Sequence, residues 1–311
     1  MMKKLISIVF PTYNESENIE ELYSRIINVT KNIKKYNFEL ICIDNCSTDD
    51  TQTKLRKLAT KDKSLKLIFN SKNFGHLKSP YYGLLQSNGS AVILISSDLQ
   101  DPPENIPEFI KKWEIGAEAT FAVKNTSDES KLMFLIRSLY YSLLNKISLT
   151  KTIKNATGAG IFDKKIITLL REINDPNPYF RGLVCEITNS IDTVTFSQPK
   201  RVKGSSKNNL YSLFDLAMLG ITNHSRIPLR LMTLGGFLIS FLSLVVAIVY
   251  LFLKIFFWST FEIGAAPILI GVFFFGALQA FFIGILGEYI GTIHSRTRNL
   301  PLVVEKERIN F

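Results

Sequence analysis

The segment AVILISSDLQDPP, residues 91–103, carries the pattern on which the fold prediction depends. An apolar run is followed by two serines, by Asp98 and Asp101, and finally by two prolines. Such a run is typical of a strand buried on both faces, and the prolines turn the chain away from the sheet. Carboxylates at the carboxyl end of such a strand lie where open α/β sheets bind ligands, and hard oxygen atoms there suit Mg²⁺ or Mn²⁺ with a diphosphate. The alternative is a polar strand end that caps the next helix.

The first half of the chain repeats this succession of strand and polar loop. Strands that alternate with helices predict an α/β fold with a mostly parallel sheet and right-handed crossovers. Each polar cluster follows a strand, which predicts a nucleotide site at the carboxyl edge of the sheet. Neither G-x-G-x-x-G nor G-x-x-x-x-G-K-S/T occurs, so the dinucleotide fingerprint and the P-loop are excluded. The expected strands are Leu5–Phe10, Phe38–Ile43, Leu65–Phe69 and Ala117–Val123. Four helices are expected: one that ends at about Lys35, one that includes Leu55 and Leu58, one over Tyr81–Gln86 and one over residues 104–114.

After residue 123 the pattern changes. Residues 131–149 are strongly apolar with basic residues at the rim, which indicates an amphipathic helix at a membrane face or, alternatively, a core helix. Residues 157–163 predict a glycine-rich turn into a strand, with Asp163 as the cap of the next helix. A helix over 178–189, a strand over 193–198, a basic loop over 199–207 and an apolar-faced helix over 210–221 follow.

Two uncharged runs near the end of the chain are long enough to cross a bilayer. Leu231–Leu253 and Ala265–Leu286 contain no charged residue. A buried hairpin in a soluble protein is the alternative, but it would need a very large core. Basic residues flank the pair on both sides, which places both ends in the cytoplasm by the positive-inside rule. The predicted organisation is a cytoplasmic domain over 1–208, a juxtamembrane amphipathic helix over 209–230, two spans at about 231–253 and 265–289 within 231–290, and a cytoplasmic tail over 291–311.

Composition restricts the class of partner. The net charge is +10, which favours anionic partners such as nucleotides, lipid phosphates or a membrane surface. No basic run with interleaved aromatic residues stands out, so nucleic acid is not expected. The three cysteines, Cys42, Cys46 and Cys185, lack metal-finger spacing and indicate unpaired thiols in a reducing compartment.

The polar clusters taken together resemble a known family. The chain is similar to the family 2 glycosyltransferases of GT-A fold, specifically the membrane-anchored polyprenyl-phosphate glycosyltransferases such as the dolichyl-phosphate mannose synthases and the bactoprenol glucosyltransferases. The resemblance spans nearly the whole chain, and its motifs occur in the family's order. The matching segments are FPTYNE (10–15), IDNCSTDDT (43–51), NFGH (73–76), SSDLQDPPE (96–104), RVKGSSK (201–207) and GEYIG (287–291).

The resemblance implies a role for each matching position. It implies nucleotide-sugar contacts at Pro11, Tyr13, Glu15, Asp44, Asn73, Ser97 and Asp98. It implies a divalent ion, Mg²⁺ or Mn²⁺, on Asp98 and Gln100, with Asp101 as support. It implies that Arg201, Ser206 and Lys207 meet the diphosphate and the acceptor phosphate, with Gly204 allowing a close turn. Arg181 is a further candidate for the acceptor phosphate, and a surface salt bridge is its alternative. His76 is expected to be an ordinary residue at a helix start, and Glu288 is expected to pair with Arg296 or Arg298.

Three positions depart from the family pattern. Asn45 and Ser96 stand where the family has acids, which predicts a weaker ribose contact and a site with less negative charge. Gly158 stands where some members have an Asp proposed as a base. A hydroxyl acceptor needs a base, whereas a phosphate monoester is mostly dianionic at neutral pH. The missing acid therefore fits a phosphate acceptor better.

The resulting function is metal-assisted, inverting transfer of one sugar from a UDP- or GDP-linked donor to polyprenyl (undecaprenyl) phosphate. The expected catalytic residues are Asp98, Arg201 and Lys207, in an integral protein of the inner or plasma membrane. One alternative is a transferase that extends a lipid-linked oligosaccharide or surface polysaccharide. Another is a catalytically silent membrane protein that binds a nucleotide sugar. Small residues in the spans are compatible with a homo-oligomer.

Overall fold

The computed structural model describes residues 3–125, 153, 155–197, 218, 221–222, 225, 227–256, 265–298 and 300–311. In these ranges the chain forms one eight-stranded sheet in the order β7-β5-β6-β4-β1-β2-β3-β8. The strands are β1 (Leu5–Thr12), β2 (Asn37–Asp44), β3 (Leu65–Asn70), β4 (Ala91–Leu94), β5 (Ala119–Lys124), β6 (Ala156–Asp163), β7 (Ile191–Phe196) and β8 (Glu305–Ile309).

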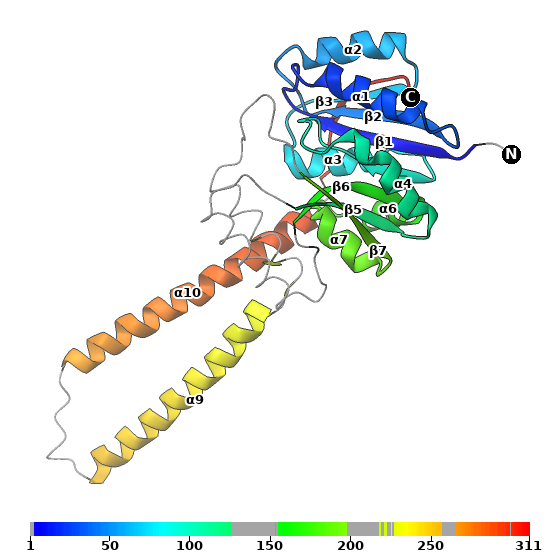
Figure 1. Ribbon diagram of the computed structural model, residues 1–311. Coiled ribbons are helices and arrows are strands. Elements are labelled where there is room, and N and C mark those ends of the chain that lie inside the picture. The colour runs from blue at the N-terminus through cyan, green and yellow to red at the C-terminus, as the bar shows by residue number, and fades with distance from the viewer. Residues whose placement is uncertain are drawn as a thin grey trace.

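Helices cover both faces of the sheet (Figure 1). One face packs on α1 (Ile19–Lys31), α2 (Thr51–Lys61) and α4 (Ile106–Glu114), and a short 3-10 turn, η1 (Pro103–Asn105), precedes α4. The other face packs on α3 (Gly75–Leu85), α6 (Lys164–Ile173) and α7 (Phe180–Ile187). Within β1, Ile6, Ile8 and Phe10 join the first layer and Val9 joins the second. This two-sided burial is the physical reason why the central strands are continuous apolar runs.

The four strands of the N-terminal half are parallel, as predicted. β1 pairs with β2 and β4, and β2 pairs with β3, all in parallel register. Two strands run the other way: β6 is antiparallel to both β4 and β5, and β8 is antiparallel to β3. The predicted turn at residues 157–163 is wrong, because these residues lie within β6. Gly160 has φ of 153°, and a Cβ there would lie 1.9 Å from the Thr120 carbonyl oxygen, so only glycine allows β5 to approach.

Helix α3 begins earlier than predicted, at Gly75, and contains Pro80. The sequence pattern suggested that the helix starts after this proline. Pro80 removes only one backbone donor, and the burial of Tyr81 and Leu84 in the core holds the turn around it.

Two long helices leave the sheet side by side, α9 (Ile227–Phe256) and α10 (Ala265–Thr297) (Figure 1). Ile227–Val246 and Gly271–Thr297 are long and apolar enough to cross a membrane, and their large apolar side chains are mostly exposed. The last turns of α10 contact the sheet domain: Asn177 donates to the Ser295 hydroxyl at 2.7 Å, and Arg296 pairs with Asp175 at 3.3 Å. Among the ion pairs of the described residues Glu288 pairs with neither Arg296 nor Arg298, so the expected pairing is wrong.

Residues 291–311, expected as a tail, supply the end of α10 and the edge strand β8. The predicted amphipathic segment 131–149 lies outside the described residues, and so does most of 209–230.

Candidate functional site

The carboxyl ends of β1, β2, β3 and β4 meet at one edge of the sheet. β2 and β4 lie on opposite sides of β1, so the strand order reverses between β1 and β4. Open α/β sheets bind ligands in the crevice at such a reversal. The Ser97 hydroxyl donates to the Pro11 carbonyl at 2.6 Å and joins the two strand ends there. Ser97 is buried, so in this structure it positions the strand ends.

The segment after β4 forms a tight turn around Asp98. Leu99 adopts the left-handed conformation, with φ of 61°, and buries its side chain. The backbone N–H of Gln100 donates to Asp98 Oδ1 at 3.1 Å, and the Ser96 hydroxyl oxygen lies 2.8 Å from the same atom. These contacts hold the half-buried Asp98 carboxylate at the strand end.

Asp101 lies on the other side of Ser96 and is almost completely buried. Its Oδ2 lies 2.6 Å from the Ser96 hydroxyl oxygen, and its Oδ1 is buried with no hydrogen-bond partner among the described residues. Ser96 has one hydroxyl proton, so it cannot donate to Asp98 and Asp101 together. Burial raises the pKa of Asp101 and the charge of Asp98 adds to the rise, while polar contacts with Ser96 and Thr157 lower the pKa by less.

The raised pKa of the buried Asp101 makes the stability of the protein depend on pH. A carboxyl whose pKa is higher in the folded state than in the unfolded state, where it is ordinarily 3.8, lowers the free energy of unfolding as the pH rises between the two values. The Asp101→Asn variant has no carboxyl to titrate and therefore lacks this loss of stability. Its side-chain amide can still donate a hydrogen bond to the Ser96 hydroxyl oxygen. The Tm of the variant minus the Tm of the wild type, both measured with a chelator present, should therefore increase as the pH rises from about 4. A Tm difference that does not change with pH contradicts a raised Asp101 pKa.

Asp44, at the end of β2, is fully buried and organises the loop that follows. Its Oδ2 accepts from the Ser47 N–H at 3.0 Å and from Gln52 Nε2 at 2.7 Å, and its Oδ1 accepts from the Thr12 hydroxyl at 3.4 Å. Because Asp44 is fully buried, direct contact with a nucleotide base would require neighbouring groups to move. The predicted base contact of Asp44 stays a prediction, and the visible role of this carboxylate is to shape the loop.

The loop that carries Tyr13 and Glu15 is bonded to the same region. The Glu15 N–H donates to the Thr51 hydroxyl at 2.9 Å, and the Glu15 carboxylate accepts from Asn18 Nδ2 at 2.7 Å. Tyr13 and Glu15 are both half-buried. The structure therefore brings the predicted base and ribose contacts together at the ends of β1 and β2.

Asn45 connects the end of β2 to the loop after β3. Its Oδ1 accepts from Asn70 Nδ2 at 3.0 Å and from the Phe74 N–H at 2.9 Å, and its Nδ2 donates to Asn73 Oδ1 at 2.8 Å. An aspartate at position 45 could not donate to Asn73, whereas the Asn45 amide both accepts and donates in these contacts. Asn73 itself is exposed and also accepts from the Gly75 N–H at 2.8 Å.

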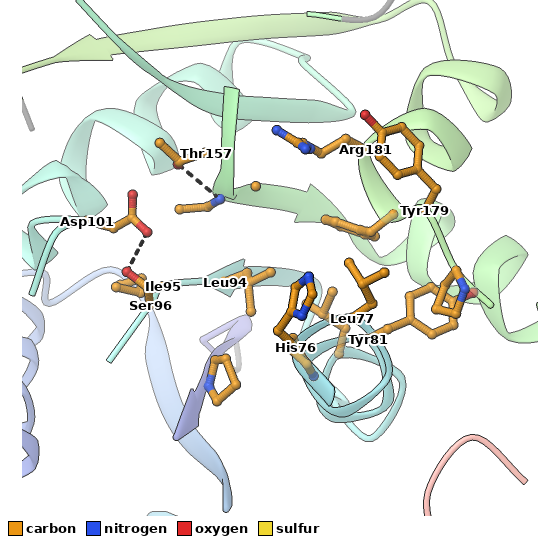
Figure 2. A pocket seen from close by; sticks show the side chains of 17 residues that line it. His76, Leu77, Tyr81, Leu94, Ile95, Ser96, Asp101, Thr157, Tyr179 and Arg181 are labelled. Atoms are coloured by element: carbon orange, nitrogen blue, oxygen red, sulfur yellow. Dashed lines mark hydrogen bonds between the residues drawn. The ribbon is translucent and has the colours of Figure 1, made fainter. Parts of the chain in front are cut away.

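A cavity of about 280 Å³ opens beside Ser96 and Asp101, between α3, β6 and α7 (Figure 2). Figure 2 shows His76 and Leu77 on one side of this cavity, with Tyr179 and Arg181 across from them. Its wall is mostly apolar and aromatic, and its polar lining residues include His76, Ser96, Asp101, Thr157 and Arg181. The apolar and aromatic wall includes Leu77, Pro80, Tyr81, Leu84, Leu94, Ile95, Pro178, Tyr179 and Phe180.

Arg181 is the arginine of this cavity wall. Its Nη1 donates to the Ala156 carbonyl at 2.6 Å, and its guanidinium carbon lies 5.6 Å from the centre of the Tyr179 ring. The side chain is therefore held between β6 and α7 and faces the cavity. Its contact with an acceptor phosphate stays a prediction.

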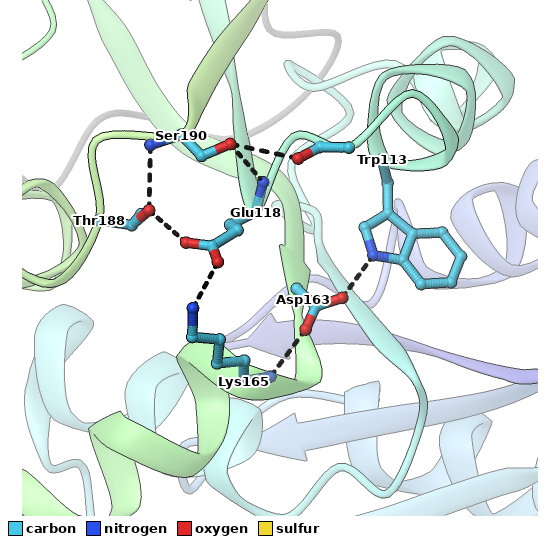
Figure 3. Close-up of polar contacts among 7 residues, drawn as sticks. Trp113, Glu118, Asp163, Lys165, Thr188 and Ser190 are labelled. Atoms are coloured by element: carbon cyan, nitrogen blue, oxygen red, sulfur yellow. Dashed lines mark hydrogen bonds and ion pairs between the residues drawn. The ribbon is translucent and has the colours of Figure 1, made fainter.

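Gly158 lines the same cavity with φ of 98°, and a Cβ at this position would meet no atom within 4 Å. The nearest following acid, Asp163, is engaged elsewhere: it caps α6 by accepting from the Lys165 N–H at 2.8 Å and accepts from Trp113 Nε1 at 2.7 Å (Figure 3). The predicted cap is confirmed. Asp163 therefore does not replace the carboxylate that is missing at Gly158.

Some predicted site residues cannot be placed. Arg201, Gly204, Ser206 and Lys207 lie outside the described residues. The aromatic wall formed by Tyr179 and Phe180 was not predicted, although both residues directly precede Arg181. Their position next to this predicted phosphate contact was the only available signal, because the wall depends on how α7 packs against α3.

Known proteins similar to this chain identify its family. Residues 7–169 match the family model described as glycosyl transferase family 2. The chain is 32% identical to the bactoprenol glucosyl transferase of Shigella phage SfX over 304 residues, covering 97% of this chain and 99% of that protein. It is 30% identical to the prophage bactoprenol glucosyl transferase homolog of Escherichia coli K12, covering 97% and 98%.

A structural comparison supports the fold. Glucosyl-3-phosphoglycerate synthase from Mycobacterium tuberculosis, solved with Mn²⁺, UDP and phosphoglyceric acid, matches 70% of this chain and 76% of its own, with a TM-score of 0.50 and 17% identity. The α/β arrangement of the sheet domain is therefore of the GT-A type. With its strand-end carboxylates, its adjoining cavity and near full-length relatives, the chain belongs to the family 2 glycosyltransferases.

Proposed function

We propose that this glycosyltransferase transfers one sugar from a nucleoside-diphosphate sugar to a polyprenyl phosphate at the membrane surface, with inversion at the anomeric carbon. The observation that carries the proposal is the cavity that reaches from Ser96 and Asp101 to Arg181, with Asp98 in contact with Ser96 next to it. Such a cavity has one end beside the proposed metal ligand Asp98, suited to a metal-bound diphosphate, and a cationic end suited to a second phosphate. The two candidate membrane helices and the relatives named as bactoprenol transferases support a lipid acceptor.

The donor set at the strand end fits a divalent cation shared with substrate. No group of three His, Cys, Asp or Glu side chains converges within the described part of the chain. Mg²⁺ is commonly bound by one or two carboxylates together with substrate phosphates and water, so a smaller protein donor set is sufficient. Asp98 would hold the ion, with Gln100 beside it. The bound ion would neutralise charge on the leaving diphosphate.

The residues of the cavity suit a phosphate nucleophile. Arg181 would bind and orient the acceptor phosphate, and Arg201, Ser206 and Lys207 are proposed as its further contacts. A phosphate monoester is mostly dianionic at neutral pH, so attack on the anomeric carbon needs no base at Gly158. Holding donor and acceptor in one cavity converts a bimolecular reaction into one between bound groups. The apolar wall excludes water, which would otherwise compete as acceptor.

The membrane arrangement follows from the charge pattern. We propose an integral protein of the inner or plasma membrane, with the sheet domain and both chain ends in the cytoplasm. The basic residues on either side of the helix pair support this orientation. Arg296, at the cytoplasmic end of α10, bonds to Asp175 of the sheet domain, which keeps the catalytic cavity close to the membrane surface.

The proposal is tested by transfer assays on purified full-length protein in lipid. We expect UDP- or GDP-linked labelled sugar, with Mn²⁺ and undecaprenyl phosphate, to yield a lipid product from which mild acid releases the label. Label that enters only a longer glycan would instead support a transferase acting on a hydroxyl acceptor. Nucleotide binding with no transfer to any acceptor would support a silent binding protein and contradict the proposal.

A further inference from the structure

The C-terminal segment, residues 300–311, returns from α10 to the edge of the sheet beside the predicted donor site. In Figure 1 it crosses the sheet domain near β3 and α2. β8 pairs antiparallel with β3, from Leu67 opposite Ile309 to Asn70 opposite Glu305, and the register shifts between Phe69 and Asn70. The strand therefore follows β3 to the point where the loop of the predicted site begins.

Side-chain contacts hold the C-terminal segment along its whole length. Leu302 and Val303 are buried in the apolar cluster that also contains α3. Arg56 pairs with Glu307 at 2.8 Å, and Asn310 Nδ2 donates to the Leu65 carbonyl at 2.8 Å. Buried apolar side chains, an ion pair and paired backbone together indicate a docked element of the fold.

One backbone hydrogen bond joins the C-terminal segment to the donor loop, residues 71–75. The Ser71 N–H donates to the Val304 carbonyl at 2.9 Å. Phe74 packs on the same apolar cluster as Leu302 and Val303. Asn73 lies between these two attachment points, and Asn45 binds it from the opposite side. The exposed part of the loop is thus fixed by the C-terminal segment at one end and by β2 at the other.

We propose that the C-terminal segment is a positioning element of the donor site, which holds the donor loop in the conformation that binds the nucleotide. The inference rests on the proposed function, because it takes Asn73 as a nucleotide contact. A loop that is already ordered binds its ligand more tightly than one that must become ordered on binding. Coupling between two sites is reciprocal, so nucleotide binding must strengthen docking of β8 by the same factor.

The first experiment compares the full chain with a chain that ends at Arg298, both in lipid nanodiscs. We expect the truncated chain to bind UDP, or GDP if only that binds, at least about fivefold more weakly. Its KM for the donor should rise by a similar factor, while kcat at saturating donor stays close to that of the full chain. Equal nucleotide affinity in both chains would overturn the inference.

A point variant serves if the truncated chain does not fold. Ser71→Pro removes the N–H that donates to Val304 and also restricts the backbone of residues 70 and 71, and it should weaken nucleotide binding in the same way. Ser71→Ala is the matched control, because it retains that N–H and should bind like the wild type. Equal binding by the proline and alanine variants would overturn the role of this bond.

Hydrogen exchange on the unmodified protein supplies an independent readout. UDP should slow amide exchange in β8 by about the factor that truncation costs in affinity. β7 is the opposite edge of the sheet and serves as the internal control, with exchange unchanged. Unchanged β8 exchange with UDP bound would contradict the inference alone. A full chain that binds no nucleotide would remove the proposed function and this inference together.

Discussion

Asp98→Asn is expected to lower the rate of sugar transfer by about 100-fold or more. The amide oxygen can still accept from the Gln100 N–H, so the turn after β4 should keep its shape. What is lost is the negative charge that would hold the divalent ion against the diphosphate. The measurement is the initial rate of transfer to undecaprenyl phosphate at saturating donor, together with the dependence of UDP affinity on Mn²⁺.

Glu104→Gln is the matched control for this variant. Glu104 lies six residues further along the same segment, and its carboxylate bonds to Arg25 at 2.9 Å on the surface. Removing this charge should leave both transfer and metal dependence near wild type. If Asp98→Asn retained full metal-dependent transfer with an unchanged Tm, Asp98 would not be the metal ligand.

Gly158→Leu is expected to reduce transfer by about 100-fold, because the new side chain would fill the cavity where donor and acceptor meet. No atom lies within 4 Å of a Cβ built at this position, so the leucine has space only in the cavity. The backbone at φ of 98° is unfavourable for any side chain, at a cost of about 1–3 kcal/mol in stability. Transfer rate and Tm should therefore be measured together.

Gly158→Ala separates these two effects. Alanine has the same backbone strain as leucine but adds one methyl group, so its Tm should fall by a similar amount while most transfer activity remains. If both variants lost activity equally, backbone strain would explain the loss, and the cavity would not be where the sugar is transferred.

The strands of the N-terminal half were predictable because their pattern is local. Leu5–Phe10 and Ala91–Ile95 are buried on two faces, which leaves continuous apolar runs that need no knowledge of their neighbours. The antiparallel course of β6 could not be predicted in the same way. Its direction depends on which strands it pairs with, and a glycine-rich run such as 157–163 is compatible with both a turn and a strand.

The sequence was sufficient to predict which residues belong to the candidate site, but not how their side chains are arranged. Asp98 and Asn73 were identified from their motifs, and Arg181 as a further candidate for the acceptor phosphate. Whether a motif side chain faces a ligand or the protein interior depends on packing: Asp44 and Ser97 are buried, and both bond to neighbouring loops or strands. The shared contact of Asp98 and Asp101 with one hydroxyl requires side-chain positions that spacing does not specify.

By itself, the sequence determined the family, the strand ends that carry polar side chains, and the two apolar helices, because a short stretch of sequence is enough to recognise each of them. Only the tertiary structure decided which acid is buried beside Ser96, where the cavity next to Arg181 lies, and that the chain end returns as β8 beside the donor loop. Those features arise from contacts between residues far apart in the chain. Their free energies depend on burial and on hydrogen-bond and packing partners from distant parts of the chain, and a local sequence pattern contains no information about either.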